Sequence, residues 1–291
     1  MKFDDNRITI RERSYIDLLD LALRVIRVYA WPLAVALLVG VAPMICLNAW
    51  LLADYAEVDF ELGFPATYCW YMLQLVIWEM PLATAPITLY LGQALFMQRP
   101  SARRMVAGFS ASLPQLLIYQ VLCRGTLIPV AWIFTFSIYS RPLQTLVHVG
   151  IFAWFALFAV WPYLSEVILL ERNPMQRHGT QRMTTFRRTR ALHRGSLGDL
   201  FPRWLGALVI GGLLFVCFWF SIWLMGGMLL SEWEWEGHPL TLYYPLALWL
   251  VVGYFAVVRF LCYLDLRIRR EGWEVELLMR AEGARLARQL T

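Results

Sequence analysis

The sequence predicts an all-α integral membrane protein, a bundle of about six transmembrane helices with an N-terminal interfacial amphipathic helix and a C-terminal cytoplasmic helix. First, 59% of the 291 residues are hydrophobic and the mean hydropathy is +0.54, which is more apolar surface than one soluble core can hide. Second, the 14 Trp and 13 Tyr suit the boundary between hydrocarbon and headgroups. Third, apolar segments of about 20 residues recur, the length that spans a bilayer. We therefore expect residues 1–291 to form a single membrane domain.

The first 30 residues are expected to form a cytoplasmic and interfacial segment. Over 14–29 the apolar residues recur at helical spacing, and charged residues follow a separate stripe. Ser14 is suited to cap the helix with Asp17 three residues on, and Asp20 precedes Arg24 by four residues. We expect this helix to lie in the membrane surface and to lead into the first span.

Two spans are expected next. Residues 31–52 carry no charge over about 20 residues, which is enough to cross the hydrocarbon core. The apolar run over 65–97 is longer than one straight crossing needs and contains Glu79, Pro81 and Pro86. A tilted or kinked helix is expected there, because proline removes a helical hydrogen bond.

The segment 106–139 is apolar but interrupted by Pro114, Arg124 and Gly125. We expect one crossing with Arg124 near its middle. The alternative is an interfacial or re-entrant helix that ends at Arg124, so the state of residues 106–145 stays open. Clearer spans are predicted at about 146–170, 204–230 and 240–264, followed by a cytoplasmic tail over 265–291.

The basic residues predict the orientation. Of the 26 Lys and Arg residues, 24 lie in four regions, namely 1–30, 98–104, 171–203 and 259–291. With six spans all four fall on one side, whereas the loops at 53–64 and 231–239 carry acids and no Lys or Arg. The positive-inside rule then places both termini in the cytoplasm of a bacterial inner membrane protein.

Two charged residues are predicted to lie deep in the hydrocarbon region. Glu79 and Arg124 both fall near mid-depth, where an unpaired charge costs roughly 2.5 to 3.5 kcal/mol on insertion scales. We therefore expect an intramembrane ion pair between them. A role in packing and topology is favoured over a proton or substrate pathway, because transport sites usually gather several polar groups on unwound helices.

Further charged residues are expected near the cytoplasmic boundary. Glu166 lies at the end of its span and is expected to pair with an arginine of the following loop. Arg267, Arg269 and Arg270 are expected to reach anionic headgroups, with Trp273 at the level of the interface. Because glutamates lie among these arginines, a docking surface for another protein is the open alternative.

No signature of catalysis, cofactor binding or metal binding is present. The five cysteines are scattered through apolar runs without C-x-x-C spacing, and no Walker, G-x-G-x-x-G, G-x-S-x-G or H-E-x-x-H motif occurs. The arginines of 171–203 could attract phosphate or nucleic acid, but orientation alone explains them. We therefore expect no enzyme activity, no cofactor, no metal and no nucleic-acid partner. The expected partners are the lipid bilayer and a membrane or cytoplasmic protein.

Three segments resemble a known family. They are PLATAPITLYLGQALFMQRPSARR over 81–104, SEVILLER over 165–172 and YLDLRIRREGWEVELL over 263–278. In this order they resemble the membrane domain found with some bacterial glycerophosphodiester phosphodiesterases and in related stand-alone membrane proteins. The resemblance implies a six-helix membrane domain without an assigned chemistry.

The catalytic domain of those phosphodiesterases is not expected here. Their barrel begins with a His-Arg-Gly motif, and residues 193–195 have that sequence. A barrel needs about 250 residues, however, whereas a polar loop of only about 30 residues surrounds the triplet. The first functional hypothesis is accordingly an accessory or scaffold protein that docks partners at the cytoplasmic face. The alternative is a small transporter or permease component with a pathway through Glu79 and Arg124.

Overall fold

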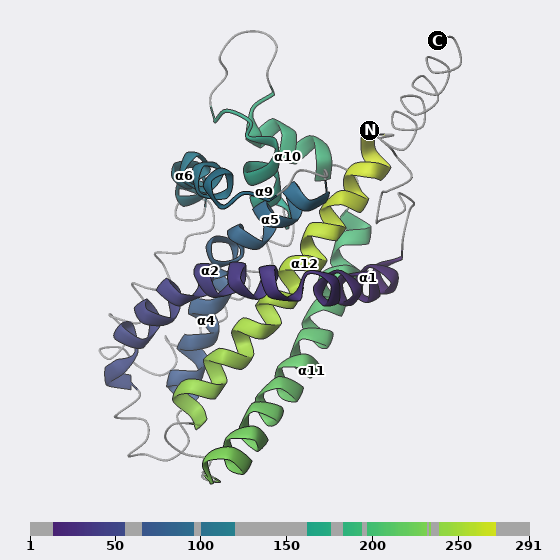
Figure 1. The fold of residues 1–291 in the computed structure, drawn as a ribbon. Helices are drawn as coiled ribbons and strands as arrows, with labels where there is room; N and C mark the ends of the chain where they lie inside the picture. Colours follow the sequence, from purple (N-terminus) through teal and green to yellow (C-terminus); the bar gives the residue numbers. More distant parts are fainter. Residues whose placement is uncertain are drawn as a thin grey trace, which may run out of the picture.

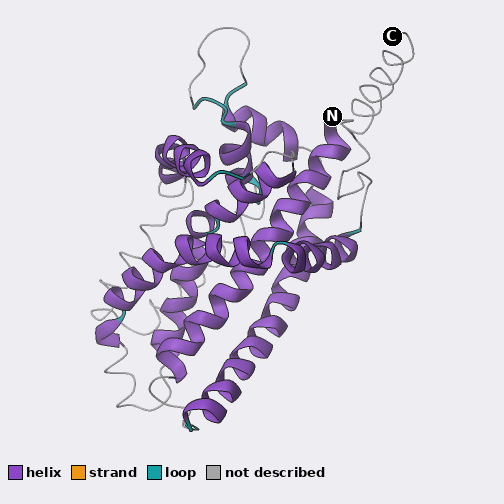
Figure 2. Ribbon diagram, viewed as in Figure 1, coloured by secondary structure: helices purple, strands orange, loops and turns teal. Residues whose placement is uncertain are grey.

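The described part of the chain is helical throughout. The computed structural model describes residues 14–55, 66–95, 100–119, 162–175, 183–193, 197–231, 233 and 239–271. Within these ranges every regular element is a helix and no strand occurs (Figure 2). The all-α fold class is therefore confirmed for the described residues.

The helices follow the chain in the order shown in Figure 1. Their bounds are α1 (Tyr15–Val28), α2 (Ala30–Leu51), α4 (Ala66–Ala83), α5 (Ala85–Leu95), α6 (Ala102–Ile118), α9 (Leu164–Glu166), the π-helical η4 (Val167–Glu171), α10 (Thr185–His193), α11 (Leu197–Leu230), the π-helical η5 (Pro239–Tyr243) and α12 (Tyr244–Glu271).

Four stretches are long and apolar enough to cross a membrane. They are Ala30–Leu51, Thr67–Ala94, Phe201–Leu230 and Leu240–Arg269, and they correspond to four of the six predicted spans. The predicted span at 146–170 lies largely outside the described residues. The one at 106–139 is described only as far as residue 119.

The N-terminal helix α1 begins as predicted but buries its apolar stripe against protein. Ser14 and Asp17 form both hydrogen bonds of a capping box, each 3.2 Å long, and Arg24 pairs with Asp20 at 2.7 Å. The buried face of Leu18, Leu19, Ala22 and Val25 joins one core with residues of α12. One apolar stripe of α1 therefore packs on α12, while the position of this helix in the membrane surface stays a prediction.

The kink predicted in the second span is a break between two helices. Helix α4 ends at Ala83 and α5 begins at Ala85, so the interruption at Thr84 falls between Pro81 and Pro86. Helix α2 crosses this break at Gly40, which lies against the carbonyl group of Ala83 and the ring of Pro86. Because only a hydrogen fits at Gly40, glycine allows this close crossing.

Helix α12 is the centre of the bundle. Its buried residues join the core with α1, α2 and α5 and a second core with α2 and α4. In the most apolar 18-residue stretch of Leu240–Arg269, 72% of the residues are buried. Helix α11 packs along α12 (Figure 1), yet no residue in its most apolar 18-residue stretch is buried. Such an apolar surface suits hydrocarbon as its solvent.

Helix α6 runs in a different direction from the long helices. Figure 1 shows α6 almost end-on, whereas α11 and α12 extend along the length of the molecule. Only a stripe of Gly108, Ser112 and Leu116 is buried, and Val106 on the outer side is 67% exposed. For residues 102–118 this arrangement fits the interfacial alternative better than a full crossing.

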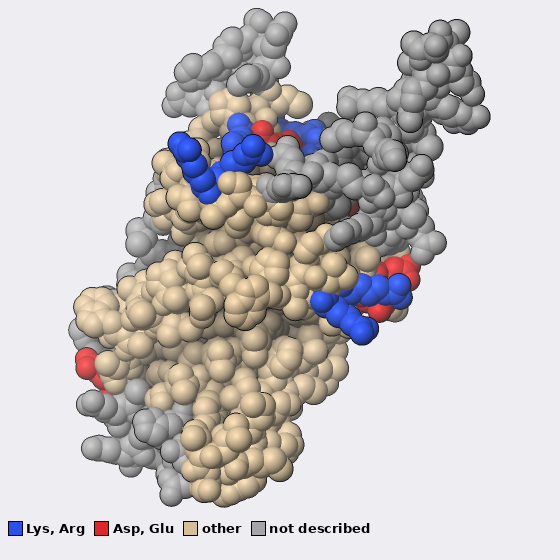
Figure 3. All heavy atoms as spheres, viewed as in Figure 1, with Lys and Arg blue, Asp and Glu red and all other residues tan. Residues whose placement is uncertain are grey.

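Helices α6 and α10, η4 and the C-terminal end of α12 lie together at one end of the bundle, which we call the basic end. Exposed Arg103, Arg104, Arg172, Arg187 and Arg190 belong to this end, and Figure 3 shows basic side chains over it. The opposite end holds the C-terminal ends of α2 and α11, with Asp54 just after α2. Asp54 and the five exposed arginines named here thus lie at opposite ends of the described part, as the charge bias of the predicted loops implies.

Candidate functional site: buried ion pairs at the basic end

A fully buried carboxylate lies between α12 and the α4–α5 break. The Glu166 side chain has no exposed surface, and its Oε1 accepts a hydrogen bond from Arg259 Nε of α12 at 2.5 Å. Arg259 Nη2 also donates to Thr84 Oγ1 at 2.9 Å, and Ser165 Oγ donates to Glu166 Oε2 at 3.1 Å. The pair therefore joins three segments that are far apart in the sequence. Arg259 Nη1 is buried and has no hydrogen-bond partner among the described residues.

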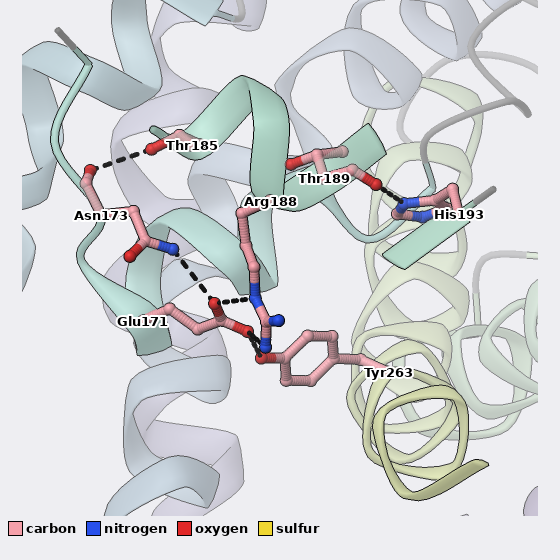
Figure 4. A network of polar contacts seen from close by, with 7 residues as sticks. All are labelled: Glu171, Asn173, Thr185, Arg188, Thr189, His193 and Tyr263. Carbon is pink, nitrogen blue, oxygen red and sulfur yellow. Dashed lines mark hydrogen bonds and ion pairs between the residues drawn. The ribbon is translucent and has the colours of Figure 1, made fainter. Parts of the chain in front are cut away.

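A second carboxylate, Glu171, binds three side chains one turn nearer the end of the bundle (Figure 4). Arg188 of α10 donates to both of its oxygens, at 2.6 and 3.0 Å. Tyr263 of α12 donates to Oε1 at 2.8 Å, and Asn173 donates to Oε2 at 3.1 Å. The bidentate guanidinium contact is the strongest geometry available to such a pair, so Glu171 holds α10 against α12.

The π-helix explains how both carboxylates can face α12. Glu166 and Glu171 are five residues apart, which in an α-helix would place them about 140° apart around the axis. In η4 the backbone hydrogen bonds run from i to i+5, so residues five apart nearly align. Their partners Arg259 and Tyr263 are four residues apart on α-helical α12, so the two repeats match.

The charges around Glu171 favour its ionised form. Burial raises the pKa of its carboxyl group, but the hydrogen bonds from Arg188 and Tyr263 and the positive charges of Arg188 and Arg267 outweigh that effect. The net result is a pKa below the ordinary value. Glu171 is thus a carboxylate at neutral pH.

His193 closes the inner side of α10. Its ring is 3% exposed and stacks on Tyr163 with 5.6 Å between ring centroids. Nδ1 lies 2.8 Å from the carbonyl oxygen of Thr189, so Nδ1 carries the proton, and Nε2 is buried with no hydrogen-bond partner in the described part of the chain. Burial lowers the pKa of the imidazole, and the Thr189 carbonyl and the charge of Glu166 only partly offset that effect.

A third ion-pair group fixes the start of α11. Asp265 of α12 is 3% exposed and accepts from Arg203 at 3.4 Å and from Arg269 at 2.8 Å. Arg269 keeps an exposed position while it binds Asp265, so its contact with lipid headgroups stays a prediction. Arg267 contributes positive charge to Glu171, while the side chain of Arg270 and all of Trp273 lie outside the described part.

The structure describes Glu79, one of the two deep charges expected from the sequence. Glu79 Oε2 accepts a hydrogen bond from Asn48 Nδ2 of α2 at 2.9 Å. Arg124 lies outside the described residues, so its pairing with Glu79 stays a prediction. Glu166 pairs with an arginine, but the partner is Arg259 of the last span instead of an arginine of the 171–203 loop. That loop's arginine, Arg188, binds Glu171.

Sequence reasoning missed the roles of Arg259, Tyr263 and Arg188. Arg259 had a usable signal, because it lies five residues before the end of an otherwise uncharged span, and a charge at that depth needs a partner. The π-helix had no such signal. Without it, Glu166 and Glu171 do not appear to share a face.

The search for a metal site and the comparisons with known proteins gave the following results. Among the described residues, His, Cys, Asp and Glu nowhere gather in threes as a metal site would require. Neither a protein-family model, a curated protein nor a solved structure matches the chain.

Proposed function

We propose that this protein is a membrane-embedded accessory or scaffold protein that docks a partner protein at its cytoplasmic face through the outer side of α10. The proposal includes a multi-pass position in a bacterial inner membrane, with the basic end and both termini in the cytoplasm. It includes no enzymatic centre of the chain's own.

The attachment of α10 carries this proposal. Arg188 and His193 hold the helix by its inner side, through the Glu171 pair and the stack on Tyr163. On the outer side Arg187 and Arg190 are exposed, and Phe186 is 45% exposed. A rigidly held face with arginine and an aromatic ring has the composition that protein interfaces favour.

The packing also supports the proposed relation to the phosphodiesterase-associated membrane domain. The three segments that carry the resemblance are in contact, because Leu170 lies against Gly92 and Tyr263 bonds to Glu171. Arg259 adds a link from Thr84 to Glu166. Short motifs that form one buried network are a coherent unit of structure.

Photo-crosslinking in native membranes tests the docking surface. A photoreactive residue at Phe186 is expected to capture a protein, and the double variant Arg187→Gln, Arg190→Gln is expected to abolish that capture. The matched control is Leu213, which is 64% exposed on α11 and is expected to capture no protein. Capture that survives the double variant, or equal capture at both sites, would contradict the proposal.

The second candidate is a transporter or permease component, favoured by the polar groups buried among α2, α4 and α5. Besides the bond between Asn48 and Glu79, both amide atoms of Gln74 and the hydroxyl of Thr88 are buried and have no hydrogen-bond partner within the described ranges. Buried polar groups in a membrane bundle often mark a pathway. In proteoliposomes Glu79→Gln should then abolish solute or proton flux, and unchanged flux would remove this candidate.

A further inference from the structure

Three acids at the basic end are already paired with arginines of the protein. Glu166 binds Arg259, Glu171 binds Arg188, and Asp265 binds Arg203 and Arg269. Exposed Arg103, Arg104 and Arg172 have no carboxylate partner among the described residues. This group carries positive charge that the described part of the protein leaves uncompensated.

These three arginines converge on α6. Arg103 and Arg104 belong to its first turn. Arg172 follows η4 in the left-handed conformation, with φ of 49°, and its guanidinium occupies the space that a side chain at Gly108 would need. Gly108 lies one turn after Arg104 on α6, so Arg172 adds its charge to the same side of the molecule.

The position of α6 places this charge at the end of a membrane span. The backbone N–H of Ser101 donates to Gln93 Oε1 at 3.1 Å, and the span Thr67–Ala94 ends one residue after Gln93. The first turn of α6 is therefore tied to the level where hydrocarbon gives way to headgroups. Val106 and Leu117, 67% and 41% exposed, give the outer side of α6 an apolar character suited to lying in that boundary.

We propose that Arg103, Arg104 and Arg172 form a recognition site for the phosphate groups of anionic phospholipids. Guanidinium forks match phosphate geometry, and exposed apolar residues beside them favour a lipid surface over a soluble anion. Each arginine contributes about fivefold to lipid affinity, which corresponds to about 1 kcal/mol. This site lies on α6 and is independent of a protein partner at α10.

Lipid titration of the purified full chain in non-ionic detergent tests the site, with bound lipid counted by native mass spectrometry. Wild-type protein is expected to retain phosphatidylglycerol in preference to phosphatidylcholine. The triple variant Arg103→Gln, Arg104→Gln, Arg172→Gln should bind phosphatidylglycerol about a hundredfold more weakly. Arg172→Gly suits the positive φ, so it should fold normally and still lose about fivefold. Arg24→Gln is the matched control, because Arg24 is exposed but already paired with Asp20.

Three outcomes would overturn the proposal. One is phosphatidylglycerol binding by the triple variant equal to that of the wild type. Another is complete displacement of the lipid by inorganic phosphate, which would make the group a site for a free anion. The third is a triple variant that still binds lipid but no longer gives the protein crosslink at Phe186, because the three arginines would then belong to the docking surface. Loss of lipid binding with the crosslink retained supports the lipid site alone.

Discussion

The Glu166 side chain has no contact with solvent and is paired with Arg259. Removing one member of a buried pair leaves the other charge uncompensated, which costs about 3 to 5 kcal/mol. We expect Glu166→Gln to lower the free energy of unfolding by that amount, measured by thermal unfolding in detergent. The double variant Glu166→Gln, Arg259→Gln should recover most of the loss.

The control for this prediction is an exposed pair in the same protein. Asp20 and Arg24 are 58% and 75% exposed, and such pairs contribute less than about 1 kcal/mol. Asp20→Asn should therefore change the unfolding midpoint little. Equal effects of Glu166→Gln and Asp20→Asn would show that the interior pair carries no special weight.

The protonation of His193 predicts how the stability of the protein depends on pH. Because the pKa of the folded imidazole is below the ordinary value of 6.5, the unfolded chain binds more protons as the pH falls through that value. Stability is therefore retained above about pH 6.5 and lost below it. His193→Phe keeps a ring against Tyr163 and should flatten this loss in thermal unfolding between pH 7 and pH 5. An unchanged slope in the variant would assign the dependence to another group.

Among the helices, the crossing of α2 over the α4–α5 break depends on one glycine. A methyl group at Gly40 would overlap the carbonyl oxygen of Ala83, so Gly40→Ala should lower the unfolding midpoint by forcing α2 away. The matched control is Gly212→Ala on α11, where an added methyl group meets nothing within 4 Å. That change should be neutral or stabilise by about 1 kcal/mol through helix propensity. Similar losses at both positions would contradict the tight crossing.

The sequence predicted the elements more fully than their contacts. Periodicity over 14–29 and the Ser14 cap gave the limits of α1, and Pro81 with Pro86 gave the kink, because these are local effects. Which surface the apolar face of α1 would meet is a tertiary choice that periodicity does not contain. The partner of Glu166 was missed for the same reason, because Arg259 lies 93 residues further along the chain.

For the whole molecule, the separation of charges predicts the topology. Single cysteines introduced by Asp54→Cys and Arg190→Cys, in a background without the five native cysteines, should lie on opposite sides of the membrane. A membrane-impermeant thiol reagent added to intact cells should label position 54 at once and position 190 only after the membrane is opened. Labelling of both positions from outside would contradict the proposed orientation.

At this scale the four apolar spans followed from composition and length, whereas their order of burial did not. The candidate spans Phe201–Leu230 and Leu240–Arg269 have similar mean hydropathies of 2.4 and 2.0. In their most apolar 18-residue stretches, however, the buried shares of the residues are 0% and 72%. Charge explains part of this difference, because α12 carries Arg259 and Asp265, which need partners. Hydropathy reports affinity for any apolar medium and does not distinguish lipid from neighbouring helices.

The π-helical turn at 167–171 works as a spacer whose length is set to a single residue. Inserting one residue after Leu169 would put Glu166 and Glu171 six residues apart, or about 120° apart around an α-helix, so that only one of the two carboxylates could still reach α12. The helix that carries Arg188 would then lose its hold while every charged residue remained in the chain. One added residue, with no change in charge, is thus enough to separate α10 from α12.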